Sequence, residues 1–90
     1  MILNTVDLWN AFYDATKDTN LKAFPTSFQS DSKIVSLSLE TGYLSNDEVF
    51  KMVDILEDNF YFVMDQTQDK MYVNSDVTNA KYNITIFERF

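Results

Sequence analysis

The helix start at Ser45 constrains the fold of this chain more than any other local feature of its sequence. Ser45 and Glu48 have the spacing of a capping box, in which each side chain accepts a hydrogen bond from the backbone N–H of the other residue. Leu44 and Val49 are placed to form the hydrophobic staple that often accompanies such a box. Apolar residues then recur at helical spacing, so the sequence predicts a helix that begins after Ser45 and ends at about Asn59.

Two segments with strand character flank this helix. Residues 33–40 alternate between apolar and polar side chains, which is the pattern of a strand with one buried face. Residues 60–64 are rich in aromatic and β-branched side chains, and this short run favours a second strand over a continued helix. A helix that joins two strands crosses over the sheet and packs on it, so we expect helices layered on a sheet.

The segment before these elements is predicted to hold a first helix and a loop. Asn4 or Thr5 is placed to cap a helix over about residues 5–17, where apolar residues recur at spacings of three and four. Residues 18–32 contain the single proline with several Ser and Thr, and are predicted to be a connection within the domain. Two isolated aromatic residues are expected to anchor this loop on the core: Phe24 and Phe28.

The segment after the central helix is predicted to complete the sheet. Polar residues 65–70 indicate a hairpin turn that leads into a strand at 71–73. A last alternation at 82–86 predicts the final strand. The expected fold is one α+β domain over residues 1–90, with two helices and a mixed, mostly antiparallel four-stranded sheet in the order α-β-α-β-β-β.

Composition supports one compact core without covalent cross-links. The chain has 90 residues, of which 46% are hydrophobic and 16% aromatic, and this is enough apolar surface for one small domain. It contains no cysteine, so stability must come from packing rather than from disulfides. The first residues form neither a basic region nor a sustained apolar stretch, so we expect no signal peptide, no membrane span and a cytoplasmic location.

Residue types that most enzymes need are missing. Histidine and cysteine are absent, and a single glycine cannot form a phosphate-binding glycine-rich loop. We therefore expect no enzyme activity, no cofactor and no metal. Paired carboxylates, such as Glu57 with Asp58, are interpreted as solvated charges, although a metal-assisted site would need only two or more of them to converge in a cleft. Lys33 and Lys81 are interpreted as surface charges rather than as Schiff-base lysines.

The acidic residues are concentrated in the second half of the chain. Fourteen Asp and Glu against seven Lys and Arg give a net charge of −7, which disfavours direct binding to nucleic acids or anionic membranes. On the central helix Asp47, Asp54 and Asp58 follow one outward stripe, spaced about 6 to 10 Å apart along its axis. This spacing is comparable with that of phosphates along a nucleic-acid strand. Glu57 and Asp58 face the negative end of the helix dipole, so folding alone does not explain them.

In general type, the whole chain resembles the small acidic inhibitors that phages and mobile elements encode against host nucleases, among them anti-CRISPR proteins and other DNA mimics. The resemblance lies in the acidity and in the abundance of Asn, Asp, Phe and Tyr, and no motif assigns the chain to one such family. It implies a stand-alone protein in the host cytoplasm that inhibits a basic nucleic-acid-handling partner, such as a CRISPR-associated nuclease, by occupying its nucleic-acid-binding groove.

Under this hypothesis the partner is bound by acidic residues of the central helix and of the turns after it: Asp47, Asp54, Glu57, Asp58, Asp65, Asp69 and Asp76. Two alternatives stay open. The acidity serves solubility alone, or an aromatic strand edge or the face around Trp9 drives homodimerisation with no inhibitory role. Salt separates these readings, because screening weakens a complex of opposite charges and leaves a hydrophobic assembly nearly unaffected.

Overall fold

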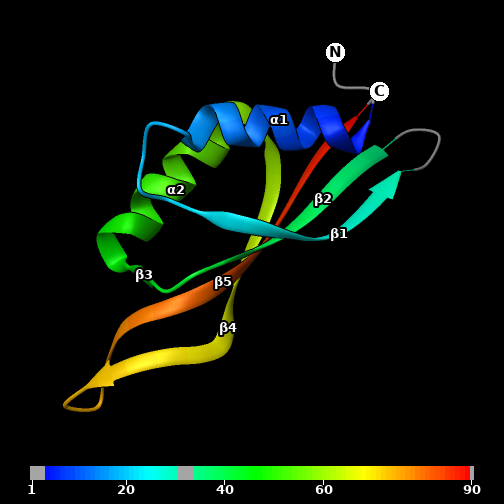
Figure 1. The fold of residues 1–90 in the computed structure, drawn as a ribbon. Helices are drawn as coiled ribbons and strands as arrows, with labels where there is room; N and C mark the ends of the chain where they lie inside the picture. The colour runs from blue at the N-terminus through cyan, green and yellow to red at the C-terminus, as the bar shows by residue number, and fades with distance from the viewer. Residues whose placement is uncertain (1–3, 31–33, 90) are drawn as a thin grey trace.

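The computed structural model describes residues 4–30 and 34–89, which form an α+β fold (Figure 1). The predicted class is therefore confirmed, while the described sheet has five strands where four were predicted. Lys33, at the start of one predicted strand, lies outside the described residues. In chain order the elements are α1 (Thr5–Thr16), β1 (Ala23–Ser30), β2 (Ile34–Thr41), β3 (Leu44–Ser45), α2 (Asn46–Asn59), β4 (Tyr61–Val73) and β5 (Asp76–Arg89).

Strand β5 is the centre of the sheet. One of its edges pairs with β4, and the other pairs with β2 and with the two-residue β3, in each case antiparallel. β1 extends the sheet by pairing antiparallel with β2. Because β2 and β4 both run antiparallel to β5, they run parallel to each other, and α2 carries the chain from one to the other. The predicted crossover helix is thus present, with β5 inserted between the strands that it connects.

Both helices lie on one face of the sheet, and the core fills the space between the two layers (Figure 1). Inward side chains alternate along β2, as the period of two in the sequence predicted. The largest of the side chains that are almost entirely buried are Leu8, Phe12, Val35, Leu37, Leu39, Met52, Leu56, Ile84 and Ile86. The opposite face carries small polar side chains, such as Ser38 and Thr85, whose hydroxyl oxygens lie 3.3 Å apart.

Both helices begin where the sequence predicted. Asn4 caps α1, and its Oδ1 accepts a hydrogen bond from the backbone N–H of Asp7 at 2.9 Å. At α2 the Oγ of Ser45 accepts from the backbone N–H of Glu48 at 3.3 Å, and Oε1 of Glu48 accepts from the backbone N–H of Ser45 at 3.0 Å. The capping box is therefore complete, and it sets the point at which the chain leaves β3 and enters α2.

The predicted loop at residues 18–32 is wrong in its middle, because Ala23–Ser30 form the edge strand β1. Only the first residue of this strand is buried, so its sequence has no alternation that would reveal a strand. Pro25 is tolerated because the strand lies at an edge, where its register with β2 also shifts. Phe24 and Phe28 are both more than half exposed, so their expected role as core anchors is also wrong.

The predicted hairpin turn at residues 65–70 is wrong as well. β4 runs through these residues as one strand with an irregular register. The chain reverses at Asn74 and Ser75, whose φ angles of 52° and 72° fit a tight two-residue hairpin turn. The end of this hairpin, residues 71–78, extends beyond both helices and is called the hairpin arm (Figure 1). Residues 71–73 are in a strand, as predicted, but they continue β4 instead of beginning a new strand after a turn.

Two substitutions measure separately how much the cap of α2 and its packing on the sheet contribute to the free energy of unfolding. Ser45→Ala removes one half of the capping box and should lower the free energy of unfolding by about 1 kcal/mol. Leu56→Ala leaves a cavity where the side chain is fully buried, and should lower it by about 2 to 5 kcal/mol. Ser36→Ala, on the open face of β2, is the control and should change it by no more than about 0.5 kcal/mol. Urea denaturation measures all three, and an unchanged midpoint for Leu56→Ala would contradict the packing of α2 on the sheet.

Candidate protein-binding surfaces

The two faces of α2 have opposite character. Met52 and Leu56 are fully buried against the sheet. Four carboxylates lie on the other side of the helix and are exposed: Asp47, Asp54, Glu57 and Asp58. Because helix residues separated by three, four or seven positions share a face, these four residues form one outward stripe, here called the acidic face.

A phenylalanine lies within the acidic face. Phe50 follows Asp47 by three residues and precedes Asp54 by four, which places it on the same stripe. It is 69% exposed, the highest value among the exposed large apolar residues of the described chain. Phe50 is not among the site residues that the sequence predicted. Its spacing from Asp47 and Asp54 could have identified it, because that spacing places Phe50 on the outward side of the helix, opposite Met52 and Leu56.

The charge of the acidic face is nearly uncompensated. In residues 4–30 and 34–89 the two ion pairs lie at the end of α1 and on the β4–β5 hairpin, and neither involves α2. α2 has one basic residue, Lys51, against five acidic ones, and none in its last turn, so Glu57 and Asp58 meet the negative end of the dipole. The fifth acidic residue, Glu48, belongs to the fold, because its hydrogen bonds with Ser45 hold the pKa of its carboxyl below the ordinary value.

Three further acidic residues of the predicted site lie elsewhere. Asp65 follows Met64, which packs against the core, so alternation along β4 places Asp65 on the sheet face away from the helices. Asp76 begins β5 at the end of the hairpin arm, and Asp69 lies on β4 within a polar cluster. The structure thus brings together Asp47, Asp54, Glu57 and Asp58, and it separates from them Asp65, Asp69 and Asp76.

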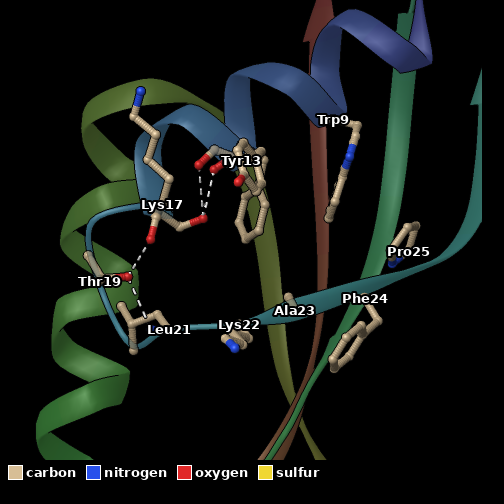
Figure 2. Close-up of a pocket in the computed structure, with 11 residues that line it drawn as sticks. Trp9, Tyr13, Lys17, Thr19, Leu21, Lys22, Ala23, Phe24 and Pro25 are labelled. Carbon is tan, nitrogen blue, oxygen red and sulfur yellow. Dashed lines mark hydrogen bonds between the residues drawn. The ribbon is translucent and has the colours of Figure 1, made fainter.

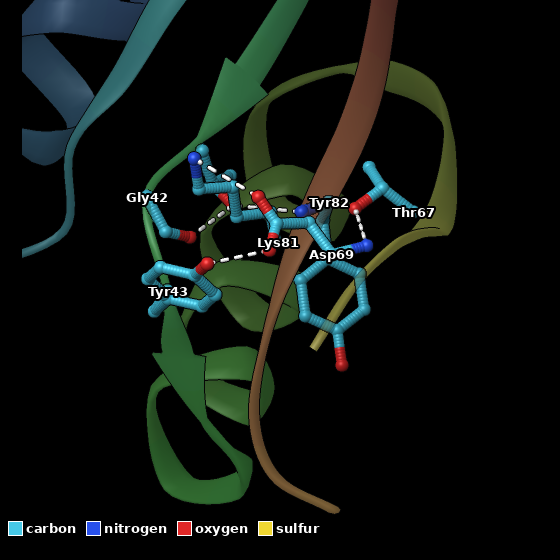
Figure 3. A network of polar contacts seen from close by, with 7 residues as sticks. Gly42, Tyr43, Thr67, Asp69, Lys81 and Tyr82 are labelled. Atoms are coloured by element: carbon cyan, nitrogen blue, oxygen red, sulfur yellow. Dashed lines mark hydrogen bonds and ion pairs between the residues drawn. The ribbon is translucent and has the colours of Figure 1, made fainter. Parts of the chain in front are cut away.

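Asp69 is the centre of a polar cluster that joins three parts of the sheet (Figure 3). Its Oδ1 accepts a hydrogen bond from the hydroxyl of Tyr43, which lies between β2 and β3. Its Oδ2 lies 3.3 Å from Nζ of Lys81 on β5. The same ammonium is 5.0 Å from the centroid of the Tyr43 ring, within the range of a cation–π contact. The cluster therefore ties β4 and β5 to the connection between β2 and β3.

These contacts shift the pKa values of all three side chains. The hydrogen bond from Tyr43, assisted by Lys81, lowers the pKa of Asp69 below its ordinary value. The same bond raises the pKa of Tyr43, and the contact with Asp69 raises the pKa of Lys81. Asp69 is thus engaged within the fold, and Lys81 is its ion-pair partner rather than an isolated surface charge.

The hairpin arm presents a second exposed surface, which is apolar. Its exposed large apolar residues are Met71, Tyr72, Val73 and Val77. Along the described part of the arm β4 and β5 pair only with each other, so a backbone edge is open on each side. An apolar hairpin end with open edges is a feature that native proteins usually cover with a partner.

Neither described helix has the length and the apolar character that a membrane span requires. Within residues 4–30 and 34–89, no three Asp and Glu side chains gather closely enough to hold a metal ion. The chain matches no protein-family model, no curated protein and no solved structure. Its function must therefore be inferred from the surfaces themselves.

Asp69→Asn is expected to remove the pH dependence that the polar cluster gives to stability. A carboxyl whose pKa is lowered by folding stabilises the fold above its ordinary pKa of 3.8, and this contribution is lost as the pH falls through the folded value. The raised pKa values of Tyr43 and Lys81 affect stability at alkaline pH. Their contributions are present below the ordinary values of 10.0 and 10.5 and are lost as the pH rises through the folded values.

The stability advantage of the parent over Asp69→Asn should therefore be largest near neutral pH and should shrink in acid and in alkali. It should be small throughout, because the cluster is exposed to solvent. Thermal unfolding across the pH range measures it. Asp65→Asn is the control, since Asp65 lies on the same strand and has no hydrogen-bonded or ionic side-chain partner in the described chain. An Asp69→Asn difference that stays constant with pH would contradict the cluster.

Proposed function

We propose that this chain is a non-catalytic binding protein that inhibits a nucleic-acid-handling partner. Its acidic face occupies the basic groove that would otherwise hold the nucleic acid, so the mechanism is DNA mimicry. The observation that carries the proposal is the set of four exposed carboxylates around Phe50 on one side of α2, with no ion-pair partner in the described chain. In line with the resemblance noted above, the partner class is a host nuclease such as a CRISPR-associated enzyme, which the chain meets in the host cytoplasm.

The geometry of α2 suits a groove that binds phosphates. At a rise of 1.5 Å per residue, Asp47 and Asp54 are about 10 Å apart along the axis, and Asp54 and Asp58 about 6 Å. A rigid helix therefore presents negative charges at intervals that a row of Lys and Arg side chains can meet together. Because such charges attract over roughly a 10 Å Debye length at 0.1 M salt, they favour fast encounter with a basic partner as well as affinity.

Phe50 supplies the apolar contact that a purely charged surface lacks. Aromatic side chains near the centre of an interface commonly contribute most of the binding free energy, while the charges around them set orientation and specificity. Phe50 occupies such a central position, between Asp47 and Asp54. A partner groove is therefore expected to combine basic side chains with one apolar pocket.

A double charge reversal tests the acidic face without disturbing the core. Glu57→Lys with Asp58→Lys should leave the free energy of unfolding within about 1 kcal/mol of the parent, because both residues are exposed and lysine suits the last turn of a helix. The same variant should lose inhibition. The partner is captured from host-cell extract on the immobilised chain, and displacement of a labelled DNA duplex from it is followed by fluorescence anisotropy. Phe50→Ala should weaken displacement by about tenfold or more.

The matched control is Asp14→Lys with Asp18→Lys, which changes the net charge by the same amount at the end of α1. This variant should displace DNA as well as the parent does. Equal displacement by the α2 variant and the parent would overturn the proposal. A captured partner that does not bind nucleic acid would overturn it as well.

The hairpin arm supports a second candidate function, namely assembly of copies of this chain. Its exposed Met71, Tyr72, Val73 and Val77 lie beside open strand edges, which favours pairing with another hairpin. In this alternative the acidity serves solubility and the chain inhibits nothing.

Sedimentation equilibrium separates this alternative from the first. If the arm drives assembly, the mass of the parent should increase with protein concentration, and Tyr72→Ser should stay monomeric because it removes the largest apolar contact of the arm. High salt should not dissociate the assembly. A parent that stays monomeric at all concentrations would exclude self-assembly through the arm.

A further inference from the structure

A groove of about 370 Å³ lies between α1 and the start of β1, and no described residue of α2 or of the hairpin arm lines it. Trp9, Phe12 and Tyr13 line it from α1, and residues 21–25 line it from the other side. Figure 2 shows Trp9 and Tyr13 directed from α1 toward β1, with Ala23 and Pro25 opposite them. Its volume falls in the range of pockets that bind small organic molecules, roughly 300 to 1,000 Å³.

The groove exists because large residues on α1 meet a small residue on β1. Phe12 is buried and Trp9 stacks on it, with ring centroids 6.0 Å apart, so these two rings form one wall. Ala23 on β1 is too small to fill the space in front of them. Tyr13 and Phe24, at the rim, are 57% and 63% exposed. Apolar surface therefore stays in contact with water here, and a ligand with an apolar body would cover it favourably.

Two of the three hydroxyl groups of the described lining, those of Thr16 and Thr19, are bonded within the protein, and the third belongs to Tyr13 at the rim. Thr16 Oγ1 donates to the carbonyl oxygen of Phe12 at 2.9 Å, and Thr19 Oγ1 donates to the carbonyl oxygen of Thr16 at 2.7 Å. Thr19 Oγ1 also accepts from the backbone N–H of Leu21 at 3.1 Å. The two threonine hydroxyls therefore need no hydrogen bond from a ligand, so the part of a ligand that lies beside them is expected to be apolar.

Among the described residues of the lining the charged ones are both lysines, Lys17 and Lys22, and none is a carboxylate. This local balance is the reverse of the chain's net charge of −7. Lys17 is held only by an exposed ion pair with Asp14 at 3.9 Å and extends away from the groove in Figure 2, whereas Lys22 takes part in neither ion pair of the described chain. A lysine side chain is long and flexible, so either ammonium group can reach an anion at the mouth, with a loss of rotamer entropy when it is fixed there.

We propose that this groove binds a small amphipathic anion, namely a monocarboxylate with an apolar body. The body lies between Trp9 and Ala23, and the carboxylate lies at the mouth with Lys22, where Lys17 can join it. An added peptide strand is disfavoured, because Pro25 has no N–H to offer and the register of β1 shifts beside it. A cation is disfavoured because the lining holds only positive charge. The groove shares no residue with the acidic face, so this inference does not depend on the proposed inhibition.

Trp9 is the single tryptophan of the chain and lines the groove, so its emission responds to a ligand there, and the amide resonances locate the change. The probes are decanoate and decyltrimethylammonium below their micelle concentrations, which share a ten-carbon body and differ in the sign of the head group. Decanoate should change Trp9 emission saturably and shift the amide resonances of residues 21–24. Decyltrimethylammonium should bind at least about tenfold more weakly.

Lys17→Gln with Lys22→Gln should weaken decanoate binding by about tenfold, because the charge-assisted contact is lost while the apolar wall remains. Lys51→Gln with Lys70→Gln is the matched control, since it changes the net charge equally outside the groove, and it should bind as the parent does. Equal binding of the two probes, or undiminished decanoate binding by the Lys17 and Lys22 variant, would overturn the proposal. So would the absence of any saturable change in both Trp9 emission and the amide resonances.

Discussion

Pairing of β5 on both of its edges is the constraint on which the rest of the structure depends. β2 and β3 pair with one edge and β4 with the other, and Ile84 and Ile86 of β5 are fully buried beneath the helices. α2 connects β2 to β4, and β5 lies between these two strands in the sheet. The crossover can therefore adopt its observed geometry only after β5 has paired with both of them. β3, α2 and β4 separate β2 from β5 along the chain, so these two strands pair through contacts that are distant in sequence, which favours slow folding.

The parts of the fold that face the core could be predicted, because burial imposes a period on the sequence. The capping box at Ser45 and the alternation in β2 are examples. β1 and the position of the hairpin turn escaped prediction for the opposite reason, since an edge strand and a projecting hairpin bury almost nothing. The candidate site also had one part that a local sequence pattern could predict and one part that it could not. Helix spacing alone grouped Asp47, Asp54 and Asp58 on one stripe, to which the structure adds Glu57. The positions of Asp65, Asp69 and Asp76 depend on sheet topology that no local pattern encodes.

α2 has one face that packs on the sheet and one face that is exposed to solvent. Met52 and Leu56 hold it on the sheet, Glu48 closes its cap, and the remaining carboxylates are left to the solvent. Glu57 and Asp58 even oppose the helix dipole, so their positions reduce stability slightly rather than support it. A binding role is expected for side chains that the fold does not need and that slightly reduce its stability. The α1–β1 groove and the hairpin arm follow the same rule, since both expose apolar side chains outside the core cluster.

The central claim is that charge on the acidic face drives binding to a basic partner. The dissociation constant of the parent chain and its captured partner, measured by titration calorimetry over a series of salt concentrations, tests this claim most directly. Affinity should fall steeply as salt rises, because the Debye length shrinks from about 10 Å at 0.1 M to about 3 Å at 1 M and screens exposed charges. An affinity that stays constant or increases with salt would contradict the claim and would indicate an apolar contact instead.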